Sequence, residues 1–138
     1  MFTRENQLMM YEMKPEYFTG IDFIDQEHAK LFEIANQAYE LLMDQYIPDK
    51  YDYIISVLQE LKEYTKYHFQ HEEEYMVSKG YMRLLSHRVD HADFIDKLDK
   101  IDLSSIDENQ KVTLLDLLDF LNDWLISHIL KKDKLIAE

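Results

Sequence analysis

Apolar residues recur along most of this chain in alternating steps of three and four, which is the spacing of one face of an α-helix. The pattern forms four blocks, which predict helices at about residues 22–44, 50–79, 82–102 and 106–131. Two glycines and two prolines in 138 residues leave the chain few places to turn. The sequence therefore predicts an all-α protein whose long helices are joined by short connections.

Short connections make neighbouring helices antiparallel, so the expected architecture is an up-down-up-down four-helix bundle. We expect residues 1–138 to form a single domain, because one core suits a chain of this length. Residues 1–21 precede the first helix and contain Pro15 and Gly20. This segment is therefore expected to form an irregular N-terminal arm.

The charge balance narrows the class of partner. Lys and Arg number 15 against 28 Asp and Glu, which gives a net charge of −13 with histidine neutral. Neither a nucleic acid nor an anionic membrane is an expected partner, because both attract clustered basic residues. The chain shows no signal peptide or membrane span, so we expect a cytoplasmic protein. The absence of cysteine excludes disulfides, iron–sulfur clusters and thiolate zinc sites.

Five of the six histidines lie on the inward stripes, together with one glutamate: His28, His68, Glu72, His87, His91 and His128. In an antiparallel bundle, the starts of the first and third helices meet the ends of the second and fourth. At about 1.5 Å of rise per residue, these six side chains lie at similar depth. One such histidine is usually a core residue with a hydrogen-bonding partner. Five imidazoles and a carboxylate buried without metal would cost several kcal/mol, so the sequence predicts a metal site.

The predicted donor set is rich in nitrogen, contains carboxylate and lacks sulfur. Imidazole suits zinc, copper, iron and nickel, and carboxylates suit harder ions. Five histidines exceed what one ion with an open position needs, so we expect two ions with bridging carboxylates. Glu72 is one candidate bridge, and Asp133, five residues after His128, is the other. Five residues span about 140° beyond a full turn, so Asp133 turns inward only if the helix ends or loosens there.

Three further polar residues lie beside the expected ligands of the second helix. On a helical wheel, Glu73 and Glu74 lie about 140° and 240° from His68, so both are expected on a solvated face. His71 lies about 60° from the stripe in the other direction and is expected at its boundary. The Glu-x-x-His motif of ferritin-like di-iron proteins does not occur before any of the six histidines, which disfavours that class.

The polar segments occur in a fixed order over most of the chain: GIDFIDQEHAKLF at 20–32, YHFQHEEEYM at 67–76, HRVDH at 87–91 followed by Phe94, and WLISHILKKD at 124–133. In this order they resemble the hemerythrin family, in particular its single-domain bacterial members. The resemblance implies two iron ions joined by an oxo or hydroxo bridge. One iron would be held by His87, His91 and His128, and the other by His28 and His68. Glu72 and Asp133 would bridge them.

The same resemblance implies reversible binding of dioxygen, for storage, delivery or scavenging, by a protein that is not an enzyme. Dioxygen would bind at the iron that has two histidines. Such a site must be dry, and the candidate pocket residues within a turn of the ligands are Leu31, Phe69, Leu125 and Ile129. A di-iron redox enzyme or a sensor that reacts with dioxygen, peroxide or nitric oxide is the alternative. Two positions depart from many relatives: Glu27 replaces a glutamine and Met13 a tryptophan.

Overall fold

The structure is a computed structural model that describes residues 13–101 and 103–136, so residues 1–12 of the predicted arm lie outside it. The long helices are α2 (Asp22–Met43), α3 (Tyr51–Ser78), α4 (Leu84–Asp99) and α5 (Gln110–His128). Short elements flank them: the 3₁₀ turns η1 (Pro15–Tyr17) and η2 (Leu103–Ser105), the π-helical turn η3 (Ile129–Asp133) and α6 (Lys134–Ile136). The described residues contain no strand.

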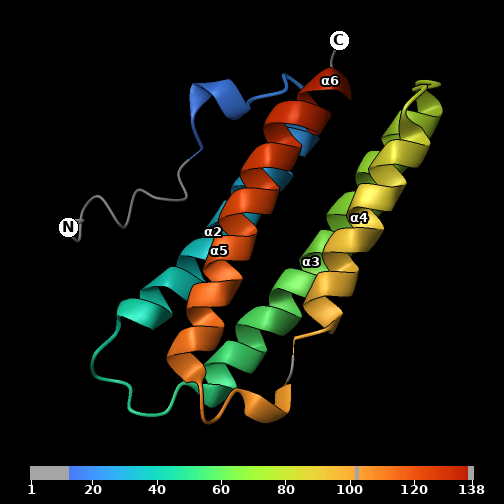
Figure 1. The fold of residues 1–138 in the computed structure, drawn as a ribbon. Helices are drawn as coiled ribbons and strands as arrows, with labels where there is room; N and C mark the ends of the chain where they lie inside the picture. Colours follow the sequence, from blue (N-terminus) through green and yellow to red (C-terminus); the bar gives the residue numbers. More distant parts are fainter. Residues whose placement is uncertain (1–12, 102, 137–138) are drawn as a thin grey trace.

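The four long helices run alternately up and down, as Figure 1 shows, which confirms the predicted antiparallel bundle. Helix α2 packs beside α3 and α5, and α3 packs beside α4. Helices α2 and α4 begin, and α3 and α5 end, at the end of the molecule where α6 lies. We call this the α6 end of the bundle. All the predicted ligand positions therefore fall toward one end.

Helices α4 and α5 begin later than the predicted ranges 82–102 and 106–131. Met82 lies in the turn before α4 and is 97% exposed. Ile106 satisfies the apolar stripe and is fully buried, but it lies in the connection before α5 begins at Gln110. A residue that is buried in a connection can continue the apolar spacing of the neighbouring helix. Periodicity alone therefore places the start of such a helix too early.

The described part of the arm, residues 13–21, is irregular apart from η1, as predicted. Tyr17 is buried, and its ring centroid lies 5.6 Å from that of Phe32. The backbone N–H and the hydroxyl of Thr19 both donate to the carboxylate of Asp25, at 2.8 Å. These contacts fix the start of α2, the helix that carries the first of the predicted ligands.

Aliphatic side chains from α2, α3 and α5 fill the bundle beneath the histidines; the fully buried ones include Leu31, Ile34, Ile54, Leu61, Leu114 and Leu121. An aromatic cluster joins this core to the histidine layer. The ring centroid of Phe94 lies 4.4 Å from that of Trp124, 5.1 Å from that of Phe120 and 5.7 Å from that of Phe69. The histidine layer therefore packs directly against a dense apolar core.

We expect Phe94→Ala to lower the free energy of unfolding by about 3–5 kcal/mol, because it removes a fully buried ring and leaves a cavity. Leu85→Ala, in the same helix at 73% exposure, is the matched control and should change it by less than about 0.5 kcal/mol. Urea denaturation of the metal-free protein measures both. Equal effects would contradict the packing of α4 described here.

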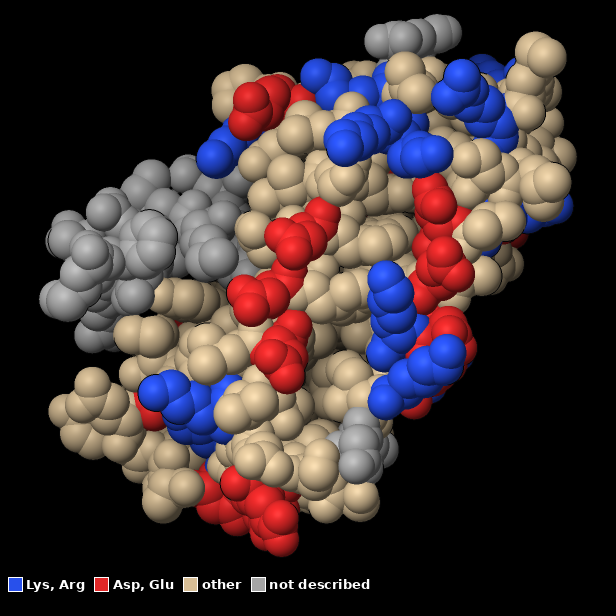
Figure 2. All heavy atoms as spheres, viewed as in Figure 1, with Lys and Arg blue, Asp and Glu red and all other residues tan. Residues whose placement is uncertain are grey.

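On the face drawn in Figure 2, charged side chains of both signs lie in small groups among uncharged residues. Basic side chains gather toward the α6 end, and further ones lie beside the acidic rows below. None of the described helices is long and apolar enough to cross a membrane.

Candidate metal centre

Buried polar side chains from every long helix and from η3 meet at the α6 end of the bundle: His28, His68, Glu72, His87, His91, His128 and Asp133. Each of them is at most 6% exposed. The histidines come from the inward stripes, as the spacing predicts. The structure thus brings together every residue that the sequence offers as a metal ligand.

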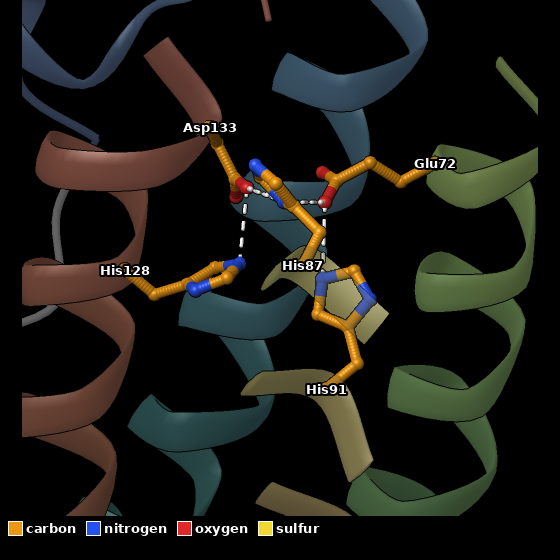
Figure 3. A group of neighbouring side chains, drawn as sticks. All are labelled: Glu72, His87, His91, His128 and Asp133. Atoms are coloured by element: carbon orange, nitrogen blue, oxygen red, sulfur yellow. Dashed lines mark ion pairs between the residues drawn. The ribbon is translucent and has the colours of Figure 1, made fainter. Parts of the chain in front are cut away.

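The donor atoms of these residues form two overlapping groups. The three-histidine group consists of His87, His91, His128, Glu72 and Asp133, and it is drawn in Figure 3. The two-histidine group consists of His28, His68 and the same two carboxylates. Within each group, the donor atoms lie within 4.8 Å of one another. The two groups therefore share their carboxylates and differ in their imidazoles.

The carboxylate of Glu72 turns one oxygen toward each group. Its Oε1 lies 3.2 Å from Nε2 of His91, in the three-histidine group. Its Oε2 lies 3.3 Å from Nε2 of His68, in the two-histidine group. A carboxylate in this position can bind one ion through each oxygen.

Asp133 reaches the site through the π-helical turn η3. Figure 3 shows its carboxylate facing that of Glu72 from the opposite side of the bundle. Its Oδ1 lies 3.0 Å from Nε2 of His128, and its Oδ2 lies 2.8 Å from Nε2 of His28. The wider turn brings a residue five positions after His128 back to the same face. The helix thus loosens at the place where the sequence requires it for Asp133 to turn inward.

Many donor atoms of the site form no well-aligned hydrogen bond with the described residues, although several of them face one another at ion-pair distance. They are both ring nitrogens of His28, both carboxylate oxygens of Glu72 and Asp133, Nδ1 of His87, and Nε2 of His91 and His128. A buried polar group without a partner costs about 1–3 kcal/mol. So many converging lone pairs fit bound metal better than a core completed by the protein alone.

The charges of the site raise the pKa of its histidine His68 and lower the pKa of its carboxylate Glu72. Burial would lower the pKa of His68, but the Glu72 charge and the hydrogen bond to Glu27 raise it to about 10. Burial would raise the pKa of Glu72, but the facing His68 holds it well below its usual range. Without metal, the site therefore favours ionised carboxylate beside protonated imidazole, and an entering cation must displace protons.

Two further carboxylates hold the outward nitrogens of the histidines. Glu27 is buried, and its Oε1 lies 2.8 Å from Nδ1 of His68. Its Oε2 lies 2.6 Å from Nδ1 of His71, the half-buried histidine at the stripe boundary. On the other side of the site, Oε2 of Glu73 lies 2.9 Å from Nδ1 of His91. Such outer contacts fix the orientation of metal-binding imidazoles.

The prediction that Glu73 lies on a solvated face is wrong. Its side chain is 23% exposed and reaches across to α4, where it also accepts a hydrogen bond from Nε of Arg88 at 3.2 Å. The wheel angle is correct for α3 alone, but α4 packs against this side of α3 and receives the side chain. Glu74 is exposed as predicted.

Apolar and aromatic groups enclose the site. The predicted pocket residues are all buried, with exposures of 1% for Leu31, 4% for Phe69, 2% for Leu125 and 1% for Ile129. The ring of Phe69 stacks on His91 with centroids 3.9 Å apart. The ring of Trp124 stacks on His128 at 4.3 Å. Both stacked rings therefore lie against the three-histidine group, and the Phe69 ring also lies 5.8 Å from that of His68 in the two-histidine group.

A comparison with known families matches residues 19–138 to the hemerythrin HHE cation-binding domain. The chain belongs to the hemerythrin family. The bacteriohemerythrin of Clostridium acetobutylicum is 46% identical over 125 residues, which cover 91% of this chain and 97% of that protein. The bacteriohemerythrin of Methylococcus capsulatus is 31% identical over 124 residues, or 87% of this chain and 88% of that protein.

Membership in the hemerythrin family confirms the resemblance carried by the four polar segments. It also gives the buried cluster at the α6 end a chemical class, since the matching hemerythrin domain is a cation-binding one. The imidazoles and carboxylates gathered there are the donors that such a domain needs. The residues that match the family model, 19–138, include all the residues of the candidate metal centre.

Proposed function

We propose that this protein holds a pair of iron ions at the α6 end of the bundle and binds dioxygen there reversibly, without catalysing a reaction. One observation carries the proposal: the shared carboxylates of Glu72 and Asp133 each turn one oxygen toward each histidine group. A single ion would need only one oxygen of each carboxylate, whereas two ions would use both. Membership in the hemerythrin family supports iron among the ions that imidazole and carboxylate accept.

The proposed ligands divide unequally between the two ions. His87, His91 and His128 would hold one, His28 and His68 the other, and Glu72 and Asp133 would bridge them. The second position has one imidazole fewer, so it is the one with room for dioxygen. When bound, a ferrous pair would supply the two electrons that reversible binding of dioxygen requires.

The residues around the ligands exclude water from the site and fix the orientation of its imidazole rings. Leu31, Leu125 and Ile129 are almost fully buried, and side chains of this kind exclude water that would compete for an open metal position. Glu27 and Glu73 hold the outward nitrogens of His68 and His91, so these rings cannot turn away from the site. We propose that these apolar residues, together with Phe69, form the pocket for dioxygen.

The proposal is tested by metal content and by optical spectra of the reduced, oxygenated and deoxygenated protein. We expect two irons per chain and visible bands that appear with dioxygen and vanish when it is removed. Two irons that oxidise once and do not return would instead favour a redox enzyme or a sensor. A single zinc ion, or no metal after reconstitution with iron, would contradict the di-iron assignment.

A further inference from the structure

Besides the two shared carboxylates, the described core contains one more buried carboxylate, Glu27 on α2. It belongs to neither group of donor atoms. Its two oxygens lie 2.8 Å from Nδ1 of His68 and 2.6 Å from Nδ1 of His71. The side chain of His71 is 40% exposed, and its ring packs 4.3 Å from that of Phe23. Glu27 therefore joins a buried imidazole of the two-histidine group to an imidazole at the surface.

A glutamate at this position can accept a hydrogen bond from both histidines, one through each carboxylate oxygen. An ionised carboxylate only accepts, so both facing Nδ1 atoms must carry a hydrogen. Nε2 of His68 is then unprotonated in the neutral ring and points into the site with its lone pair, as a metal ligand requires. A glutamine could accept from His68 through its oxygen, but its NH₂ group could pair with His71 only in the tautomer whose Nδ1 carries no hydrogen. Glu27 thus fixes His68 and His71 at the same time.

The corresponding carboxylate at the three-histidine group is electrically different. Glu73 holds Nδ1 of His91, but its other oxygen contacts the guanidinium of Arg88, whose charge offsets its own. Among the described residues, the ion pairs of Glu27 are both with histidines. The Glu27 side chain is also more buried, at 8% exposure against 23% for Glu73. Its negative charge is therefore less compensated and less screened by water.

We propose that Glu27 is a positioning residue that acts through His68 to favour the higher oxidation state of the metal in the two-histidine position. This inference rests on the proposed di-iron function. A carboxylate at Nδ1 increases the donor strength of Nε2, and its negative charge stabilises added positive charge on the metal. The same contact should tighten metal binding at this position. It would make the electrons of that ion easier to give to dioxygen.

The test compares Glu27→Gln with the unaltered protein in two measurements. Titration of the metal-free protein with Co(II) should show one of two binding steps weakened by about 10- to 100-fold, the usual effect of losing such an outer contact. In the iron-loaded protein, the midpoint potential should shift upward. Glu33→Gln, an equal loss of charge at a side chain 63% exposed on the same helix, should change neither measurement.

A second variant separates charge from position. Glu27→Asp keeps the negative charge but withdraws it from His68 and His71. It should weaken the same binding step while leaving the potential nearer to that of the unaltered protein than Glu27→Gln does. Because it retains an acidic group at the same position of the sequence, it also serves if the glutamine variant does not fold.

The outcomes separate this inference from the proposed function. An unaltered protein that binds two ions, with Glu27→Gln leaving both steps and the potential unchanged, would overturn the role of Glu27 alone. Equal weakening of both steps would overturn it as well, since it would indicate a general structural effect. An unaltered protein that cannot take up two ions would overturn both the inference and the proposed function.

Discussion

Replacing Glu72 with glutamine should abolish stable loading of both iron ions. Its two oxygens face one histidine group each, so the substitution weakens both positions at once. Leaving buried positive charge without its partner costs roughly 3–5 kcal/mol, which is more than about a hundred-fold in affinity. Iron content per chain after reconstitution and desalting measures the effect, together with the loss of the visible bands.

Two variants sharpen this result. Glu74→Gln removes an exposed carboxylate two residues further along α3 and should load iron normally. His28→Ala should affect mainly the two-histidine position, because His28 belongs to that group and not to the other. Retention of two tightly bound irons by Glu72→Gln would show that this carboxylate does not bridge.

Removing the iron should lower the melting temperature by roughly 10–20 °C. A ligand that binds only the folded state at a thousand times its Kd contributes about 4 kcal/mol, and each kcal/mol moves the melting point of a domain of this size by roughly 3–5 °C. The structural reason is that many buried donor atoms of the site form no hydrogen bond with the described residues. Thermal unfolding of iron-loaded and chelator-treated samples, followed by circular dichroism, gives the shift.

The Glu72→Gln variant is the control for this second prediction. It cannot hold the ions, so its melting temperature should be the same with and without iron. An equal shift in that variant would mean that the chelator acts on the protein itself. No shift in the unaltered protein would mean that the ions contribute nothing to the fold.

The bundle follows from the sequence because its apolar stripes are long and regular. Four stripes with short connections allow few architectures, and the histidines on them converge by geometry alone. The helix ends are less predictable. Ile106 is buried from a connection and so imitates a further turn of α5. Hydrophobic spacing indicates directly which residues are buried, but it does not show where a helix begins or ends.

The proposed metal ligands can be predicted from the sequence, but the carboxylates that hydrogen-bond to them cannot. His68 and Glu72 on α3, like His87 and His91 on α4, are separated by about one turn of their own helix, so spacing finds them. The contact between Glu27 and His68 joins residues 41 positions apart on two helices. It depends on the rotation of α2 against α3 and on side-chain direction, which a helical wheel does not contain. Glu73 escaped prediction for the same reason, since the partner that draws it inward lies on α4.

The π-helical turn has a consequence for variation in chain length. The ligand pairs on α3 and α4 are four residues apart, whereas His128 and Asp133 are five apart, yet each pair spans one turn of its own helix. An ordinary α-turn one residue shorter would therefore also keep the last pair on one face. Because α6 begins directly after Asp133, it would keep nearly the same direction as well. Deleting one residue between His128 and Asp133 should thus spare both the metal centre and the helix that follows it, so a search for relatives should allow both lengths.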